Sequence, residues 1–305
     1  MTELSHFILE SYQVRKTKAQ KQRFIQLMRT HLPQLQIQEG GFLKSKNLIF
    51  GDPTTAKVLL TAHYDTCAQL PVPNFIAPRN PLLSVLYSFV LIIPIVLAAL
   101  LANYLLSYVT DDYWVHYWAS LVVYFGLLAL ILFGPANKHT ANDNTSGIIT
   151  LCELINAVPD DIKDKIAFVF FDNEESGLIG SALFRKKYSG QLKNILLINF
   201  DCVSDGDNIL LAVSKTARKV HAQAINESFT APDGKQILID NAEKVYYPSD
   251  QAGFPCSIAV AALKHKRLVG YYMDRIHTNK DTVFDVENIR LLRDCTATLL
   301  QKIVK

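Results

Sequence analysis

The chain has 305 residues, a net charge of +3 at neutral pH and 50% apolar residues. This length fits one large α/β domain or two small ones. The small charge, and the lack of a basic run interleaved with aromatic residues, argue against a nucleic-acid partner. Five scattered cysteines without C-x-x-C spacing indicate reduced thiols in a cytosolic compartment rather than a disulfide framework: Cys67, Cys152, Cys202, Cys256 and Cys295.

The chain begins with amphipathic helices and continues into buried strands. Residues 3–31 alternate apolar and polar side chains at helical spacing, which predicts one or two helices packed on the domain. No apolar run in this region is long enough for a signal peptide. Asn47–Phe50 and Val58–Thr61 are predicted to be adjacent strands separated by a turn at 51–53. The second strand would deliver His63 to its carboxyl end, where the sites of open α/β sheets lie.

A proline-rich stretch over 67–80 leads into two long apolar runs. The first, over 82–109, has no charged residue, and the second, over 113–134, has His116 as its only ionisable residue apart from tyrosines. About 20 apolar residues in a helix cross a bilayer, so we predict a transmembrane helix from each run. Aromatic residues cluster near the intervening turn, as in interfacial belts. A buried hairpin in a soluble domain, or a dimer interface, is the alternative, but two such runs would overfill a domain of this size.

After Gly134, predicted strands alternate with predicted helices. The strands are Ile166–Phe171, Ile195–Phe200, Ile209–Val213 and Ile258–Leu263, and the helices cover residues 148–157, 177–188, 215–229 and 286–304. This alternation predicts an α/β fold with a largely parallel sheet covered on both faces. We expect a discontinuous domain from residues 1–75 and 136–305, with the apolar hairpin inserted at 76–135.

Charged residues recur where strands should end or in loops rich in Gly, Ser and Asn: His63 with Asp65, Asp143, Glu174 with Glu175, Asp201, and His277. Each alone is also typical of a cap, a turn or a solvated helix start. Together they indicate a metal site, because adjacent glutamates after a buried strand need a counter-charge and no lysine or arginine cluster accompanies them. Two histidines and three carboxylates suit a pair of divalent ions, zinc foremost, with manganese or cobalt as alternatives.

Two carboxylates would then remain outside the ligand set. A bridging carboxylate can hold two ions roughly 3.5–4 Å apart with a hydroxide shared between them. Asp65 could accept the free ring N–H of His63 and orient that ring. One of the two adjacent glutamates could take a proton from water and pass it to a leaving amine.

The ordered motifs HYDT, DNTSG, EES-GLIGS, INFD, SDQAGF and HTNKDT closely resemble those of the M28 zinc aminopeptidases and their relatives. The resemblance covers roughly residues 5–75 and 136–305. The last two motifs favour this family over the M20 peptidases, which share the first and third motifs but carry a separate lid domain. The resemblance implies a three-layer α/β/α zinc-peptidase fold with a mostly parallel mixed central sheet, here with an inserted two-helix transmembrane hairpin.

The resemblance also implies a role for each motif residue. His63 and Asp201 would bind one zinc, Glu175 and His277 the other, and Asp143 would bridge the two. Asp65 would support His63, and Glu174 would be the general base and acid for a metal-bridging hydroxide that releases N-terminal residues from peptides. A cis peptide bond is implied between Asp143 and Asn144. Other amide chemistry (glutaminyl cyclisation, dipeptide or acyl-amino-acid hydrolysis) and a non-catalytic membrane adaptor are the alternatives, although an adaptor would need none of these seven residues.

Two features depart from the family pattern. Gln251 stands in SDQAGF where relatives often have His, so substrate contacts there are expected to differ. His63 and Asp143 are 80 positions apart, where most relatives have a short loop. The hairpin fills this interval, so it must leave and re-enter the domain near the metal site.

The charges that flank the hairpin predict its orientation. Arg79, Lys138 and His139 lie on the domain side of the two runs, whereas the turn between them carries only Asp111 and Asp112. By the positive-inside rule we expect an integral membrane protein with its peptidase domain on the cytoplasmic side. The expected partners are a peptide substrate and the lipid bilayer, through residues 82–134. We further expect the hairpin to hold the active-site mouth near the bilayer, which would favour membrane-proximal or apolar peptides.

Overall fold

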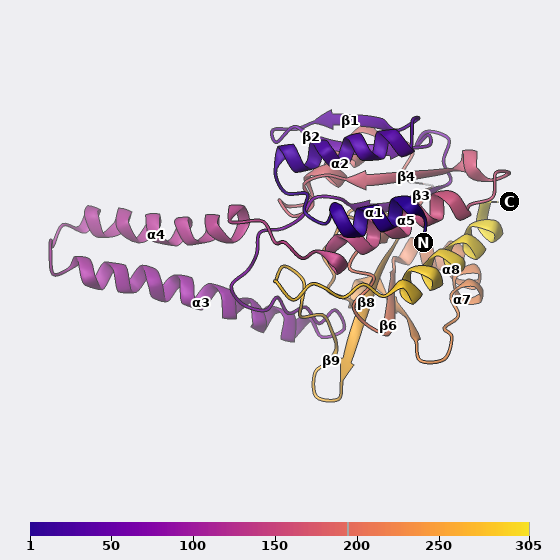
Figure 1. Ribbon diagram of the computed structural model, residues 1–305. Helices are drawn as coiled ribbons and strands as arrows, with labels where there is room; N and C mark the ends of the chain where they lie inside the picture. The colour runs from indigo at the N-terminus through magenta and orange to yellow at the C-terminus, as the bar shows by residue number, and fades with distance from the viewer. Residues whose placement is uncertain (194, 305) are drawn as a thin grey trace.

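The computed structural model describes residues 1–193 and 195–304, which are built around a mixed nine-stranded sheet (Figure 1). The strand order is β1-β2-β4-β3-β5-β8-β6-β7, with β9 paired to β8. Strands β4, β3, β5 and β8 run parallel, whereas β2 and β6 are antiparallel to their neighbours β4 and β8. The strands are β1 (Gln36–Gly40), β2 (Ser45–Phe50), β3 (Val58–His63), β4 (Ile166–Phe171), β5 (Leu196–Phe200), β6 (Asn208–Val213), β7 (Gln236–Asn241), β8 (Ser257–Lys266) and β9 (Gly270–Tyr272).

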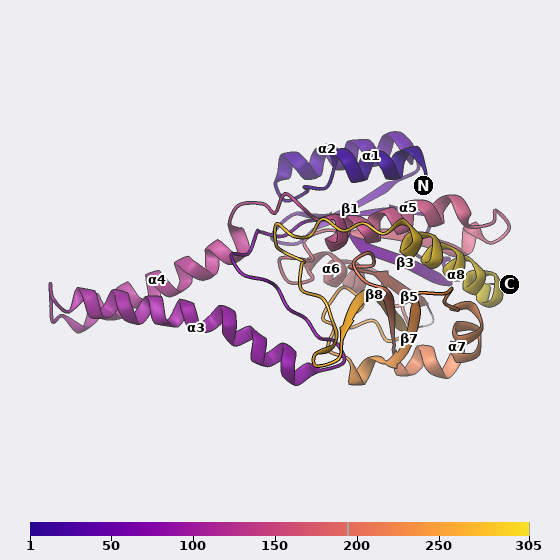
Figure 2. The same cartoon turned by 60° about the horizontal axis from the view of Figure 1, so that its bottom comes forward.

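Helices cover both faces of the sheet, which confirms the predicted three-layer α/β/α architecture (Figure 2). One face is covered by α1 (Glu3–Ser11), α2 (Lys18–His31), α5 (Gly147–Ala157), α7 (Lys215–Ser228) and α8 (Val286–Val304). The other is covered by α6 (Ile179–Lys187) and the loop after it. Short helical turns lie at η1 (Ala141–Ser146), η2 (Lys163–Lys165) and η3 (Ala242–Lys244).

The sequence explains why the central strands sit where they do. Every residue of β3, β4 and β5 is buried, as expected for continuous apolar runs covered on both faces. The two N-terminal helices begin at caps: Thr2 accepts a hydrogen bond from the Ser5 amide, and Thr17 forms a capping box with Gln20. These helices pack on the sheet as predicted.

One expectation about the sheet is wrong, and three strands were not expected. β2 and β3 are not adjacent, because β4 lies between them and pairs with both. A strand that arrives about 100 residues later thus separates two strands that are neighbours in sequence. The unpredicted strands β1, β7 and β9 lie at sheet edges or at the end of β8. β1 has a single apolar residue and β7 an apolar run of only three, so neither gives a strong strand signal.

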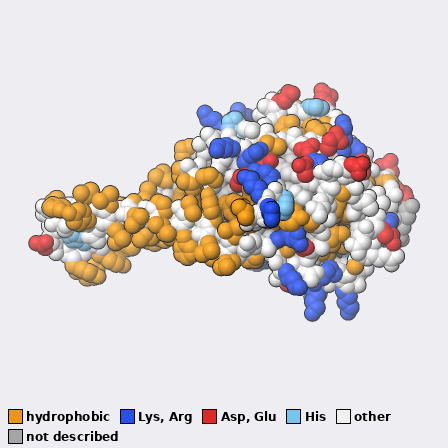
Figure 3. Space-filling view, turned by 90° about the horizontal axis from the view of Figure 1, so that it is seen from below, with side chains coloured by type: hydrophobic (Ala, Val, Ile, Leu, Met, Phe, Trp, Pro, Cys, Tyr) orange, Lys and Arg blue, Asp and Glu red, His pale blue; other side chains and the backbone are white. Residues whose placement is uncertain are grey.

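The predicted hairpin is present as α3 (Pro81–Leu106) and α4 (Tyr113–Phe133), which lie side by side and project from the domain (Figure 1). α3 ends three residues earlier than expected. In its most apolar 18-residue window 11% of residues are buried, and in that of α4 none are. Figure 3 shows hydrophobic side chains covering the hairpin while charged side chains gather on the domain. Both helices are long and apolar enough to cross a membrane.

The hairpin leaves and re-enters the domain at one place, next to the end of β3. The outgoing and returning segments pair through a bridge between Ala68 and Ala136. The Gln69 amide donates to the Pro135 carbonyl at 2.9 Å, and the Asn137 amide to the Cys67 carbonyl at 3.2 Å. A second bridge, between Ile76 and Met273, fixes the outgoing segment to the loop after β9. The insertion is therefore anchored on backbone hydrogen bonds beside the predicted metal site.

Candidate metal centre

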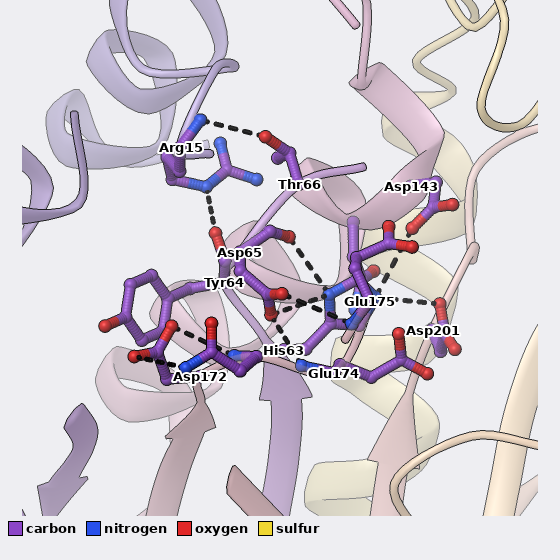
Figure 4. Close-up of polar contacts among 12 residues, drawn as sticks. Arg15, His63, Tyr64, Asp65, Thr66, Asp143, Asp172, Glu174, Glu175 and Asp201 are labelled. Atoms are coloured by element: carbon purple, nitrogen blue, oxygen red, sulfur yellow. Dashed lines mark hydrogen bonds and ion pairs between the residues drawn. The ribbon is translucent and has the colours of Figure 1, made fainter. Parts of the chain in front are cut away.

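Figure 4 shows His63, Asp65, Asp143, Glu174, Glu175 and Asp201 together at the carboxyl ends of three neighbouring parallel strands, and His277 joins them from another loop. His63 ends β3, Glu174 and Glu175 follow β4, and Asp201 follows β5. Asp143 comes from η1, directly after the hairpin, and His277 from the loop after β9. The sheet order β4-β3-β5 therefore brings together motifs that are far apart in sequence.

Asp143 occupies the middle of the cluster. Its Oδ1 lies 3.3 Å from His63 Nε2, and its Oδ2 lies 2.9 Å from His277 Nε2. On the first side His63 Nε2 is also 3.5 Å from Asp201 Oδ1, and on the second side His277 Nε2 is 3.3 Å from Glu175 Oε2. Each carboxylate oxygen of Asp143 thus faces a different histidine, which is the arrangement that a bridging ligand requires.

The donor set fits a pair of divalent cations. The ligand atoms of His63, Asp143 and Asp201 lie within 4.8 Å of one another, and so do those of Asp143, Glu175 and His277. Imidazole nitrogens with carboxylate oxygens suit zinc. Oε1 of Glu175 is buried and has no hydrogen-bond partner among the described residues, a costly state for a carboxylate unless a cation faces it.

The pKa shifts of residues in the cluster also indicate a site for positive charge. Burial lowers the pKa of His277, but Glu175 and Asp143 outweigh it and raise that pKa to about 9. Burial, with Asp143 nearby, raises the pKa of Glu175 to about 8 although His277 opposes this. The clustered carboxylates are therefore stabilised by nearby positive charge, which protons or metal ions can supply.

Asp65 contacts both His63 and the turn that carries the two glutamates. Nδ1 of His63 lies 3.1 Å from the backbone carbonyl of Asp65 and 3.7 Å from its carboxylate, so the carbonyl is the acceptor. Because a carbonyl only accepts, Nδ1 carries the proton and Nε2 is left free to bind a metal. The Asp65 carboxylate instead accepts the amides of Glu174 at 3.0 Å and Glu175 at 3.2 Å. Asp65 thus fixes the turn that carries both glutamates.

The loop ANDNTSG is fixed to the loop that carries Asp201. Asn144 donates to the Phe200 carbonyl at 2.9 Å and accepts from the Gly147 amide at 3.0 Å, and Asn142 accepts from Ser204 at 2.7 Å. The Asp143–Asn144 peptide bond is cis, which confirms that expectation. A Cβ at Gly147 would lie 2.3 Å from the Phe200 carbonyl oxygen, so this close approach requires glycine.

Asp281, Asp250 and Gln251 lie within the recognised motifs, but their sequence positions alone indicate no role at the metals. Asp281 accepts the Asn142 amide at 2.8 Å and the Asp143 amide at 3.0 Å, so the His277 loop positions Asp143 at the centre of the cluster. Asp250 is buried, and burial raises its pKa to about 7. The Gln251 side chain donates to the Tyr247 carbonyl at 2.7 Å and accepts from the Asn199 side chain at 3.1 Å. Gln251 therefore supports the site through contacts within the domain.

Two more residues at the site had no signal in sequence. The Tyr247 hydroxyl donates to the Asp201 carbonyl at 3.0 Å. Cys67, four positions after His63, places its sulfur within 4.8 Å of ligand atoms of Asp143, Glu175 and His277. Burial, followed by the neighbouring Glu175 and Asp143, raises the pKa of this thiol well above its usual value. All five cysteines are free, in line with the expected reduced thiols.

Two basic residues of the N-terminal segment, Lys21 and Arg15, lie near the site but pair with other residues than the proposed ligands. Lys21 pairs with Asp172 at 2.5 Å. Arg15 is fully buried; its Nε donates to the Tyr64 carbonyl at 2.6 Å and its Nη1 to Thr145 at 3.2 Å. Neither contacts a proposed ligand oxygen, and among residues 1–193 and 195–304 only the two histidines form ion pairs with Asp143, Glu175 and Asp201.

Arg15→Met is expected to lower the free energy of unfolding by about 3 kcal/mol, because it leaves the buried Tyr64 carbonyl next to His63 without a donor and removes the contacts of Nη1 with the Gln13 carbonyl at 2.9 Å and with Thr145 at 3.2 Å. Denaturant unfolding in detergent measures the loss. Arg23→Met, at an exposed position of α2, is the matched control and should change it by less than about 0.5 kcal/mol. Equal losses in both variants would contradict a specific role for Arg15.

A paired cluster of histidines and carboxylates at the carboxyl edge of a three-layer α/β sheet defines a metal-dependent hydrolase. The family model "Peptidase family M28" matches residues 123–302, which is more than half of the chain. The chain therefore belongs to peptidase family M28 and is a zinc-dependent hydrolase, as the motifs indicated. The matched range starts within α4, so it includes Asp143, Glu174, Glu175, Asp201 and His277 but not His63 or Asp65.

Solved structures share the fold at low sequence identity. The LapA aminopeptidase of Legionella pneumophila aligns with 99% of this chain and 71% of its own, at 14% identity and a TM-score of 0.56. LapB of the same organism aligns with 99% and 70%, at 14% identity and a TM-score of 0.54. A zinc aminopeptidase of Bacillus subtilis, BSAP, aligns over 85% and 50%, at 16% identity and a TM-score of 0.48. A search of curated proteins finds no match for this chain.

Proposed function

We propose that this protein is a membrane-anchored aminopeptidase that uses two zinc ions and releases N-terminal residues from peptides. The observation that carries the proposal is the position of Asp143, whose two carboxylate oxygens face His63 and His277 separately. One ion would be held by His63 and Asp201 and the other by Glu175 and His277, with Asp143 shared. When bound, such a pair polarises the scissile carbonyl and lowers the pKa of water.

Glu174 is the proposed general base and acid. It precedes the ligand Glu175 on the turn that the Asp65 carboxylate fixes, and its carboxylate lies within 4.8 Å of ligand atoms of His63 and Glu175. From there it would accept a proton from the attacking water and return it to the leaving amine nitrogen. Asp65 has no direct part in this transfer; it positions Glu174 and, through its carbonyl, the ring of His63.

The hairpin α3–α4 is the proposed membrane anchor, inserted at 76–135 into a peptidase domain formed by residues 1–75 and 136–305. Long apolar helices also occur as core helices of soluble proteins and as N-terminal signal sequences. The hairpin fits neither case, because its helices are exposed and lie in the middle of the chain. Arg79, Lys138 and His139 flank the domain side, which supports an integral membrane protein with the peptidase domain on the cytoplasmic side.

Metal content separates this proposal from the neighbouring chemistries. We expect two zinc ions per chain in the purified protein and about one in His277→Ala, because that change removes a ligand of only one ion. Elemental analysis after detergent extraction gives the count. His221→Ala, on the far helix α7, is the matched control and should retain two ions.

A panel of amino-acid amides then tests the reaction. Release of the free amino acid, abolished by a chelator and restored by zinc, is the expected result. If the protein instead held one zinc per chain and cyclised N-terminal glutamine without hydrolysing amides, it would be a glutaminyl cyclase rather than an aminopeptidase. Tight metal binding without turnover of any amide or acyl-amino acid would leave a non-catalytic membrane adaptor.

A further inference from the structure

Two cavities meet at the metal centre. A small one of about 120 Å³ is lined by His63, Asp143, Glu174 and Tyr247. A larger one of about 430 Å³ lies beside it. Three residues, Asn74, Glu175 and His277, line both. The larger cavity therefore reaches two of the proposed zinc ligands.

Their sizes suggest different occupants. Ligand sites in proteins usually enclose about 300–1,000 Å³. The 120 Å³ cavity is below this range and suits one small group, whereas the 430 Å³ cavity is large enough for several side chains of a peptide. A peptide with its first residue in the small cavity and its scissile carbonyl at the ligand cluster would pass Glu175 and His277 into the large one.

The outer wall of the larger cavity belongs to the hairpin. Leu91 of α3 and Ile131, Leu132 and Phe133 of α4 line it, opposite Asp65 and Cys67 of the domain. Two lysines also line it, but both already have partners: Lys16 donates to the Leu132 carbonyl at 3.0 Å, and Lys21 pairs with Asp172. Because Lys16 satisfies a carbonyl at the end of α4, it fixes this wall to the domain. What the hairpin presents to a ligand is an apolar surface.

Helix length places this wall at the membrane boundary. The 21 residues of α4 span about 32 Å, close to the roughly 30 Å of a bilayer's hydrocarbon core. The last turn of α4, which lines the cavity, would then lie at the edge of the lipid. α3 has 26 residues and is longer by about 8 Å, so its first turns can run along the domain before it enters the bilayer.

We propose that the larger cavity binds the apolar residues that follow the scissile bond, and that the substrates are peptides whose apolar N-terminal segments lie at the bilayer surface. This inference rests on the proposed aminopeptidase function and adds its substrate class. Because the larger cavity adjoins Glu175 and His277, the molecule that it binds would be the substrate. Because the hairpin wall of this cavity is apolar, the part of the substrate that it binds would be apolar.

Filling the cavity tests the assignment. Ile131→Trp adds bulk to the hairpin wall, and Leu91→Trp does so from the other helix; Leu130→Trp, 61% exposed and outside the cavity lining, is the matched control. Substrates are leucine amide, a Leu-Leu-Phe-Leu peptide and a Leu-Ser-Ser-Ser peptide. We expect both cavity variants to lower kcat/KM about tenfold for the apolar peptide and less than about twofold for the other two. Leu130→Trp should leave all three unchanged.

A binding measurement tests the same assignment without turnover. In a Glu174→Gln background, Ile131→Trp should weaken binding of the apolar peptide about tenfold by calorimetry, and Leu130→Trp should not. Equal losses on all three substrates, or no loss on any with unchanged binding, would overturn the cavity assignment. A protein that shows the expected binding pattern yet hydrolyses nothing would refute the proposed function instead.

Discussion

Glu174→Gln is expected to lower kcat/KM for amino-acid amides by about 10³-fold while the protein keeps its full complement of zinc. General acid–base catalysis contributes typically 10²–10⁴-fold. Glutamine matches glutamate in shape but cannot take a proton. The backbone amide of residue 174 would still reach the Asp65 carboxylate, at 3.0 Å in the native protein, so the turn should persist. Steady-state kinetics and elemental analysis on one preparation measure both quantities.

The neighbouring residue provides the contrast. Glu175→Gln should lower metal content as well as rate, because Glu175 is a proposed ligand. Glu243→Gln, at an exposed site that pairs with Arg218, should change neither. An unchanged rate in Glu174→Gln would remove this residue from the mechanism. Loss of zinc in the same variant would make it a ligand, and the assignment of the two adjacent glutamates would have to be exchanged.

His63, Glu174 and Asp201 could be found from sequence because each follows a strand signal that is strong by itself, whereas Asp143 and His277 lie in loops without such a signal. The runs before His63, Glu174 and Asp201 are apolar throughout, and each strand is fully buried. Parallel strands covered on both faces require such runs. The order of the strands in the sheet could not be predicted from the sequence, because β4 lies between β2 and β3 although it comes about 100 positions later in the chain. Only long-range pairing decides that order.

The supporting groups were harder to predict than the ligands. Arg15 lies in a stretch between two helices that has no pattern of its own, yet the side chain is fully buried behind His63. Asp281 sits in the motif HTNKDT, but only the fold shows that it accepts the amides of residues 142 and 143. The Asp65 carboxylate lies 3.7 Å from Nδ1 of His63, but the backbone carbonyl of the same residue is closer at 3.1 Å, and the sequence does not show which of the two oxygens the ring meets.

The hairpin changes how the metal centre is built. In this chain Asp143, the proposed bridging residue, follows α4 by ten positions, and the returning segment pairs with residues 67–69 beside His63. Any tilt of α4 relative to the domain would act on both segments. The Lys16 contact to the Leu132 carbonyl opposes such a tilt. The hairpin and the candidate metal centre are thus connected through shared backbone contacts, which explains why the hairpin ends can line a cavity beside the site.

Replacing residues 81–133 with a Gly/Ser linker is expected to move the protein from the membrane fraction to the soluble fraction. The linker removes both apolar helices, and without them no long apolar segment remains in the chain. The replaced range is limited by the contacts of its flanks: Ala68 with Ala136, and Ile76 with Met273, must be kept to preserve the loops around the site. Fractionation after carbonate extraction measures the change.

Activity in this soluble variant should depend on the substrate. Leucine amide needs only the small cavity, so its kcat/KM should stay within about threefold, whereas an apolar tetrapeptide should lose about tenfold or more with the hairpin wall. A second variant, with residues 92–106 and 113–130 each shuffled within their own helix and 81–91, 107–112 and 131–133 intact, keeps both an apolar anchor and the wall. It should remain in membranes and retain both activities. If the linker variant stayed in membranes, or cleaved the apolar peptide at the native rate, the hairpin would be neither the anchor nor part of the substrate site.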